Sequence, residues 1–280
     1  MSIHIPRRIQ TRISVSLLLA ILFTTGCADL KGINKFSLNG SQVVAQPFPY
    51  AYNEYCYDSC YCYDTTAAVS HYPCDCRIAV RYDTAVTREA GKLSAYFIAL
   101  AKLSGSADII NVDTLAGVVV AGKYGNLTIT PTDAAVVSVV ATAIQDLATA
   151  GFKSKHITQN LHRYGGAVDS ALASYITHLE ALDGQSQDLL IYLNQQLVVY
   201  RATASPGYQR WSIVYSYSEK IRDLTDRHAR FQKMIQLVRM IRDGYHAIVT
   251  NADDVGSKML KQHLLALVNN ISSLTKSVKK

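Results

Sequence analysis

The sequence lacks the short motifs by which many enzyme active sites are found. It contains no HExxH or paired Glu-x-x-His pattern for a metal, no GxSxG or supported SxxK nucleophile, and no Walker phosphate loop. A dinucleotide-binding sheet is not indicated either, because the sequence has neither a βαβ alternation nor a glycine fingerprint after a strand. The sequence therefore predicts a protein that is not an enzyme and that has no cofactor and no evident small-molecule substrate.

The sequence also lacks a large excess of charge of either sign. The chain has 28 Lys and Arg against 21 Asp and Glu, a net charge of +7. Arg7, Arg8 and Arg12 lie in an N-terminal segment that we expect to be removed, which leaves 25 bases and 21 acids, a net charge of +4. Bases alternate with acids and form no basic stripe, so the sequence predicts no nucleic-acid partner. A hydrophobic fraction of 49% leaves room for a buried core.

The N-terminus is organised like an export signal. "IPRRIQTR" is a basic segment, and "ISVSLLLAILF" is an apolar stretch too short for a comfortable transmembrane helix. It runs into "TTGC", residues 24–27. The pattern predicts a signal peptide over residues 1–26 that leaves Cys27 as the lipidated end. An ordinary secretory signal cut near Gly26 or Ala28 is the alternative.

The TTGC stretch resembles the lipobox of bacterial lipoproteins, in which a cysteine after a small residue is acylated and becomes the new N-terminus. Gly26 and Cys27 match that pattern, whereas Thr24 stands where an aliphatic residue is usual. With "LKGINKFS" at residues 30–37 and a general helical layout, the chain resembles uncharacterised helical lipoproteins of Gram-negative bacteria. That resemblance implies a membrane partner through the lipid. Ala28, in place of an aspartate after Cys27, implies an outer-membrane location facing the periplasm.

The mature chain divides into three parts. Residues 27–49 predict either a lipid-anchored tether or a short helix whose apolar residues are Leu30, Ile33 and Phe36. Residues 50–77 predict an irregular Cys/Tyr-rich loop region. Residues 78–280 predict a mainly α domain, an antiparallel bundle of long helices joined by short turns.

Apolar residues at steps of three and four predict five helices in this domain. Their approximate ranges are 78–103, 131–150, 154–202, 208–249 and 255–277. The second has a start signal at residues 130–133 and is apolar nearly all round, which predicts a place in the middle of the fold. Residues 109–129 fit a short helix, a loop or a hairpin, and helix or loop is favoured.

Two features of the long helices are specific. Gly165, Gly166 and Gly184 can kink or break the helix over 154–202. The helix over 208–249 carries a heptad-like apolar seam, and His228 lies on that seam. We interpret His228 as a core histidine with a hydrogen-bond partner.

The five cysteines after Cys27 predict a disulfide-rich loop, because thiols in exported proteins tend to oxidise. The disulfide candidates are Cys56, Cys60, Cys62, Cys74 and Cys76. Cys60 and Cys62 opposite Cys74 and Cys76 would staple a small hairpin and leave Cys56 alone. If Cys27 is not lipidated, six cysteines make three bridges. The same four thiols could instead bind zinc or copper(I), or stay unpaired.

Three functions are compatible with these features. The first is a cell-envelope lipoprotein with a structural or protein-binding role. The second is a secreted or pore-associated helical effector that acts on membranes. The third is an envelope protein that binds metal through the cysteine cluster.

Overall fold

The computed structural model describes residues 30–45, 76–105, 119, 121–124, 127–149, 154–203 and 207–278. These parts form α-helices, one 3-10 helix and a two-stranded hairpin. The elements are α2 (Lys31–Val44), α4 (Cys76–Ser104), β1 (Gly122–Tyr124), β2 (Leu127–Ile129), α5 (Pro131–Thr149), α6 (Ser154–Thr203), α7 (Tyr208–Thr250), the 3-10 helix η2 (Ala252–Asp254) and α8 (Lys258–Val278). The prediction of a mainly α fold is confirmed. Residues 46–75, where the disulfide-rich loop is predicted, lie outside the described residues.

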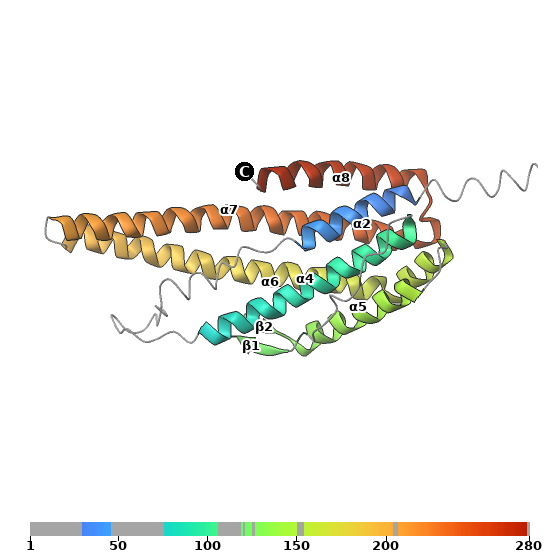
Figure 1. Cartoon of the computed structure of the whole chain (residues 1–280), viewed down its shortest axis with the longest axis horizontal. Helices are drawn as coiled ribbons and strands as arrows, with labels where there is room; N and C mark the ends of the chain where they lie inside the picture. Colours follow the sequence, from blue (N-terminus) through green and yellow to red (C-terminus); the bar gives the residue numbers. More distant parts are fainter. Residues whose placement is uncertain are drawn as a thin grey trace, which may run out of the picture.

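The helices pack around α4 and around the long pair α6 and α7 (Figure 1). α4 contacts α2, α5 and α6, while α2 also contacts α7 and α8. α6 and α7 run antiparallel, and their paired ends extend well past the other described helices (Figure 1). The molecule therefore has a thick bundle at one end and a narrow two-helix projection at the other.

The segment after Leu30 belongs to the packed bundle. Of the two alternatives for this segment, the structure has the helix: α2 is 14 residues long and lies against α4 and α8. Leu30, Ile33 and Phe36 occupy one face at steps of three, and all are buried. Leu30 is therefore already part of the packed core, in a stretch whose apolar residues are sparse but lie on one side of the helix.

α5 begins where its start signal predicts. The Thr130 hydroxyl accepts the backbone N–H of Asp133 at 3.1 Å, and the Asp133 carboxylate accepts the backbone N–H of Thr130 at 2.8 Å. This reciprocal capping box closes the first turn. The predicted central position is wrong, because α5 packs only one side against α4 and α6 and leaves Val139 exposed. The exposed side of α5 carries small residues such as Ala135, Ser138, Thr142 and Ala148, which expose little apolar area, so the apolar composition of the helix does not report burial on all sides.

Residues 122–124 and 127–129 pair as two strands of a β-hairpin, the alternative that was not favoured. β1 and β2 pair antiparallel, with Gly122 opposite Ile129 and Tyr124 opposite Leu127. Ile129 is buried against the bundle, which gives the short ladder one apolar side. Residues 106–118 lie outside the described residues, so the rest of this segment stays a prediction.

The glycines of α6 neither break nor end it, since α6 continues through Gly165, Gly166 and Gly184 for 50 residues. Gly165 instead allows close approach of α7: a Cβ atom there would lie 2.9 Å from a Val249 methyl carbon. In α7, a methyl group on Gly244 would overlap the ring of Phe36 in α2. Small residues at these crossings let the backbones come together.

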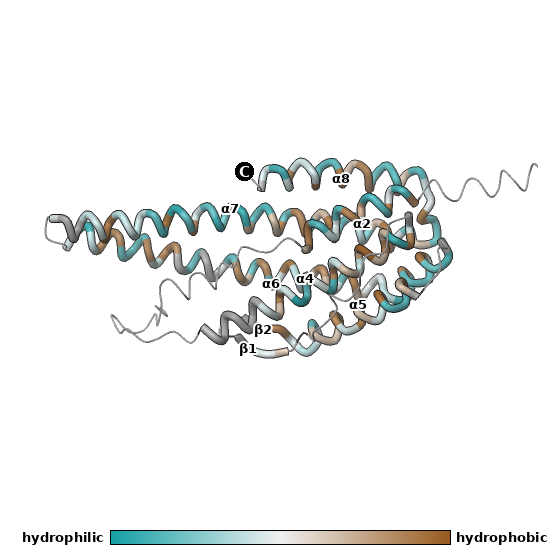
Figure 2. Tube along the Cα trace, viewed as in Figure 1, coloured by the Kyte–Doolittle hydropathy of each residue, from teal (hydrophilic) through white to brown (hydrophobic). Residues whose placement is uncertain are grey.

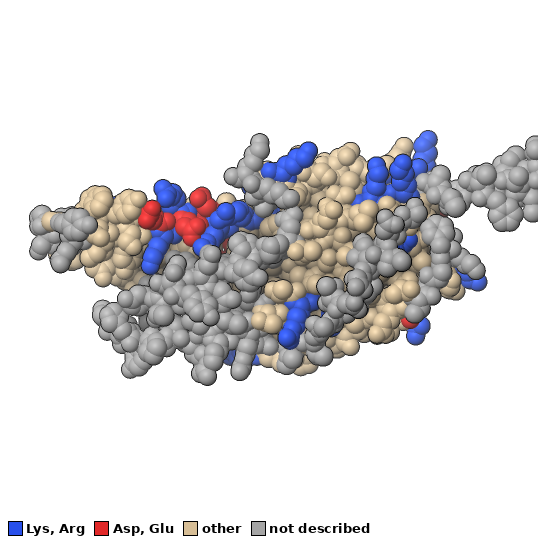
Figure 3. Space-filling view, viewed as in Figure 1, with Lys and Arg blue, Asp and Glu red and all other residues tan. Residues whose placement is uncertain are grey.

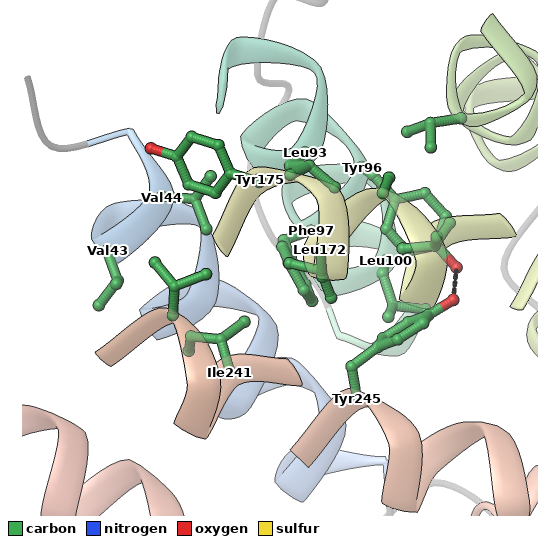
Figure 4. Close-up of a cluster of buried hydrophobic side chains, with 14 of the residues drawn as sticks. Val43, Val44, Leu93, Tyr96, Phe97, Leu100, Leu172, Tyr175, Ile241 and Tyr245 are labelled. Carbon is green, nitrogen blue, oxygen red and sulfur yellow. Dashed lines mark hydrogen bonds between the residues drawn. The ribbon is translucent and has the colours of Figure 1, made fainter. Parts of the chain in front are cut away.

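The apolar seam of α7 is confirmed over its bundle half, where Phe231, Ile235, Val238 and Tyr245 are buried. Tyr96 and Phe97 of α4 pack edge-to-face on Tyr245, with ring centroids 5.8 Å from it in both cases (Figure 4). Edge-to-face contacts of this kind place the positive ring edge on the negative ring face. The aromatic rings are therefore the centre of the core between α4 and α7.

A chain of hydrogen bonds crosses this core. The Tyr96 hydroxyl donates to Oδ1 of Asn160 in α6, 3.2 Å away, and lies 2.9 Å from the Tyr245 hydroxyl (Figure 4). Because Tyr96 has one proton, Tyr245 donates to Tyr96. The Asn160 amide in turn donates to the backbone carbonyl of Ala143 in α5 at 3.1 Å. Four helices are linked through polar atoms inside an apolar core.

We expect Gly244→Ala to lower the free energy of unfolding by about 1–3 kcal/mol, because the Phe36 ring must leave its place. Urea denaturation measures the change. Gly166→Ala is the matched control, since a methyl group there meets nothing within 4 Å and replaces a helical glycine, with an expected gain of about 0.5–1 kcal/mol. Phe36→Leu in the Gly244→Ala background should recover part of the loss. Equal effects of the two alanine substitutions would contradict the close approach.

Candidate functional site

A cluster of charged side chains is buried where α4, α5 and α6 meet. Nδ1 of His178 in α6 lies 2.7 Å from Oε2 of Glu89 in α4. On the other side of the ring, Nε2 of His178 lies 3.9 Å from Oδ2 of Asp133 in α5. The side chains of His178 and Glu89 are only 5% and 1% exposed. Ser174, one turn earlier in α6, donates to Asp133 at 2.9 Å.

The environment shifts the pKa of each of these three groups. Burial alone would lower the pKa of His178, but the hydrogen bond and charge of Glu89, with the charge of Asp133, raise it. Burial raises the pKa of Glu89 against the opposing effect of His178. For Asp133, burial is outweighed by hydrogen bonds from Thr130 and Ser174 and by the charge of His178, so its pKa is lowered.

A histidine between two carboxylates can in principle move protons, but this one faces the protein interior. Neither His178 nor Glu89 has the exposure that contact with a substrate requires. Its physical role is to tie three helices together, because a buried charge is tolerated only with its partners in place. We therefore assign the cluster to the architecture of the bundle.

One feature of the sequence indicates this buried cluster. Glu89 stands on the apolar face of α4, in line with Ala85, Leu93 and Phe97, and a carboxylate on such a face requires a partner. The nearest acid along the chain, Glu180, pairs with Arg239 in α7 and not with His178. The true pair is 89 residues apart in the chain, beyond any local pattern.

Two other histidines have partners outside this cluster. His228 on the α7 seam lies 2.8 Å from Oδ1 of Asp183 in α6, and Gln232 donates to the second oxygen of Asp183 at 2.6 Å. The prediction that His228 has a hydrogen-bond partner is confirmed, but its side chain is 30% exposed and lies outside the buried core. His162 lies 2.8 Å from Asp253 of η2 at the surface. Both contacts hold neighbouring segments together.

A surface groove between α6 and α7 contains charges that are already paired. It is lined by Ala173, Ile176, Thr177, Glu180, Arg239, Arg242 and Asp243. The Arg242 guanidinium donates two hydrogen bonds to Asp169, at 3.0 and 3.1 Å, and Arg239 donates to Glu180. The groove therefore offers little unsatisfied charge to a ligand.

The paired ends of α6 (residues 189–203) and α7 (residues 208–218) differ from the rest of the described surface; we call them the hairpin end. Most of the exposed large hydrophobic residues in the described part of the chain lie here: Ile191, Val198, Val199, Trp211, Ile213 and Tyr215. Ile191 is 56%, Val198 66% and Trp211 62% exposed. Hydrophobic segments recur along α6 toward its end (Figure 2). Exposed apolar residues are therefore concentrated on this part of the described surface.

Charged residues of α6 and α7 lie between the hairpin end and the bundle. Residues 189–218 include Arg201 and Arg210 but no Asp or Glu. Both signs of charge resume beyond them, at Asp183 and Asp188 in α6 and at Glu219, Lys220, Arg222 and Asp223 in α7. Figure 3 shows charged side chains gathered across the hairpin, with a surface free of charged residues between them and the grey tip on the face drawn.

Most of the site residues predicted from sequence lie outside the described residues. These are Cys27, Cys56, Cys60, Cys62 and Cys74. Cys76 is the first residue of α4, and the lipidation, disulfide and metal hypotheses all stay predictions. Within the described ranges no group of three or more His, Cys, Asp or Glu side chains is placed to hold a metal ion. In those same ranges no helix is long and apolar enough to cross a bilayer.

Comparison with known protein families, with curated proteins and with solved structures found no match.

The Glu89–His178 cluster predicts a pH-dependent stability. The folded chain binds these two protons more tightly than the unfolded chain, whose groups have ordinary pKa values of 4.5 and 6.5. The stabilisation from His178 is therefore complete below its ordinary pKa and is lost as the pH rises through its raised value. We expect the free energy of unfolding, measured by urea denaturation, to fall as the pH rises above 6.5, the ordinary pKa of His178, and through its raised pKa.

Glu89→Gln should flatten this fall, because it removes the charge that raises the pKa of His178. Glu180→Gln is the matched control: it removes a surface carboxylate paired with Arg239 and should leave the slope unchanged. A slope in Glu89→Gln as steep as in the unsubstituted protein would show that the cluster does not carry the pH dependence.

Proposed function

We propose that this protein is a cell-envelope lipoprotein with a structural or partner-binding role, which is anchored through Cys27 and contacts its partner through the hairpin end. The membrane it sits on is the outer membrane, and the bundle faces the periplasm. The role is not catalytic. The observation that carries the proposal is the concentration of exposed apolar side chains on a projection that extends past the bundle (Figure 1).

The position of α2 supports an anchor close to the bundle. Leu30 is buried and is only three residues from Cys27 along the chain. Three residues span at most about 11 Å, so an acylated Cys27 would hold the bundle near the lipid headgroups. Because Leu30 is buried and α2 follows it directly, only the few residues before Leu30 could separate the anchor from the bundle.

The start of α2 and the hairpin end lie at opposite ends of the described helices (Figure 1). Gly32, near the start of α2, contacts the backbone of Lys261 in the first turns of α8, which follows the bundle end of α7. From there α7 extends for 43 residues, about 65 Å, to the hairpin end (Figure 1). A protein anchored at the start of α2 would therefore present its exposed apolar residues far from the anchor.

Intact mass of the mature protein tests the anchor. We expect a chain that starts at Cys27 and carries the added mass of acyl groups, with processing blocked by globomycin and label incorporated from palmitate. Cys27→Ser should move the protein out of the outer-membrane fraction. Cys76→Ser is the matched control for loss of one cysteine and should leave the fractionation unchanged. A mature chain without added mass would make the protein a secreted one and would remove the anchor from the proposal.

A further inference from the structure

The first and last described helices meet in the bundle. α2 and α8 pack side by side and run in the same direction (Figure 1). A Cβ atom on Gly32 would lie 3.1 Å from the Cα atom of Lys261, and further along both helices Ser272 donates to Asn39 at 3.4 Å. Segments more than 200 residues apart in the sequence therefore form one surface of the bundle.

Outside the predicted signal peptide, the net positive charge comes from the segments that contain these two helices. Residues 46–251 contain 18 bases and 18 acids, so they contribute no net charge. Residues 28–45 and 252–280 together contain seven bases and three acids. Within the helices themselves, α2 and α8 have five lysines and no acid. The fold thus collects on one surface a positive charge that the sequence divides between its two ends.

The lysines of α2 and α8 lie on the outside of this surface, and we call the five residues the lysine face. Lys31, Lys35, Lys258 and Lys276 are exposed, and Lys261 is half-buried beside α2. Lys31 and Lys35 are one turn apart, and Lys258 and Lys276 are five full turns apart, so each pair lies on one side of its helix. Figure 3 shows basic side chains gathered over the part of the bundle where α2 and α8 begin.

The charge of the lysine face is largely uncompensated within the described chain. None of its four exposed lysines forms an ion pair with an acid in the described residues. The nearest acids in the sequence are Asp29 before α2, which lies outside the described residues, and Asp253 and Asp254 of η2 before α8. Asp253 is paired with His162. Like charges on one surface repel one another, so an anionic partner would relieve that repulsion.

The composition of the lysine face fits an array of anionic lipid headgroups. It has no arginine, and a lysine is a flexible point charge, whereas the fork of an arginine suits one carboxylate or phosphate in a fixed position. The only Trp, Tyr or Phe in these two helices is Phe36, which is buried, so nucleic-acid bases have no aromatic ring on which to stack. The one exposed large apolar side chain is Met259, which follows Lys258 and is 74% exposed.

The proposed anchor brings the lysine face to a bilayer. Lys31 is only four residues from Cys27 along the chain. A lipid anchor and a basic surface together hold a protein on an anionic membrane more firmly than either does alone. We infer that the lysine face binds the anionic headgroups of a lipid bilayer, with α2 and α8 against the membrane surface. This inference rests on the proposed function, because the anchor identifies the bilayer as the partner.

Co-sedimentation with vesicles tests this contact. The mature chain without acyl groups is mixed with vesicles of phosphatidylethanolamine and phosphatidylglycerol, and the fraction of protein that sediments with the lipid is measured. We expect binding to these vesicles and none to vesicles of phosphatidylcholine alone, which carry no net charge. We also expect release of the protein in about 1 M salt, where the screening length falls to about 3 Å.

Lys35→Gln with Lys258→Gln should weaken binding to the anionic vesicles about 30-fold, because each lysine near an anionic surface contributes about fivefold. Both side chains are exposed, so the fold should survive, and thermal unfolding checks that it does. Lys123→Gln with Lys220→Gln is the matched control, since it removes the same charge from β1 and α7, outside the lysine face. Its binding should be close to that of the unsubstituted chain.

Three results would overturn the inference. The first is a chain that does not sediment with anionic vesicles, or that stays bound to them in about 1 M salt. The second is an equal loss of binding in the two double variants, which would assign the binding to net charge and not to the lysine face. The third is tighter binding to a DNA duplex than to anionic vesicles at equal phosphate concentration, which would identify nucleic acid as the partner.

The outcome for the lysine face is independent of Cys27, because the chain tested has no acyl groups. Acylated Cys27 in a protein whose unacylated chain does not bind vesicles would retain the anchor and remove only the contact of the lysine face. Vesicle binding with the expected salt and variant effects, in a protein whose mature chain is not acylated, would support the lysine face and remove the anchor.

Discussion

The hydrogen-bond chain through Tyr245, Tyr96 and Asn160 is the constraint on which the bundle depends. Each hydroxyl or amide is buried among apolar side chains, where an unpaired polar group costs about 1–3 kcal/mol. The chain ends on the Ala143 carbonyl of α5, so it satisfies groups from α7, α4, α6 and α5 in one line. Sliding any of these helices by one residue would break at least one of the bonds. Apolar packing holds the helices together, and these bonds select their register.

The Glu89–His178 pair repeats the same constraint two turns away. Glu89 and Tyr96 are seven residues apart on α4, so both polar groups lie on the same side of that helix and both point to α6. A helix with two polar partners at fixed spacing can rotate or slide very little. α2 has a different attachment, since Phe36 fills the space over Gly244 and the contact is one of shape. The polar contacts of α4 thus set its position along α6, and apolar packing then sets the positions of the other helices.

The sequence predicted the long helices well, because periodicity needs only local information. The seam of α7 could be read from Phe231, Ile235 and Val238 alone. The errors fall where local pattern and tertiary environment separate. α5 is uniformly apolar through small residues, which looks like burial from all sides, and β1 and β2 are too short to show alternation. The pairing of Glu89 with His178 and the exposure of Trp211 depend on which faces meet, and a single sequence does not state that.

The seam between α6 and α7 has a consequence for how such a molecule can vary in size. Beyond the bundle, the hairpin is held by a repeating contact and by local pairs such as Asp183 with His228. Removing or adding seven residues in each helix would keep that repeat in phase and change the length of the hairpin by about 10 Å. The bundle, with its polar ties on α4, would not have to be rebuilt. The hairpin is therefore a spacer of adjustable length, and the distance between the two ends of the molecule can change in steps while its fold stays the same.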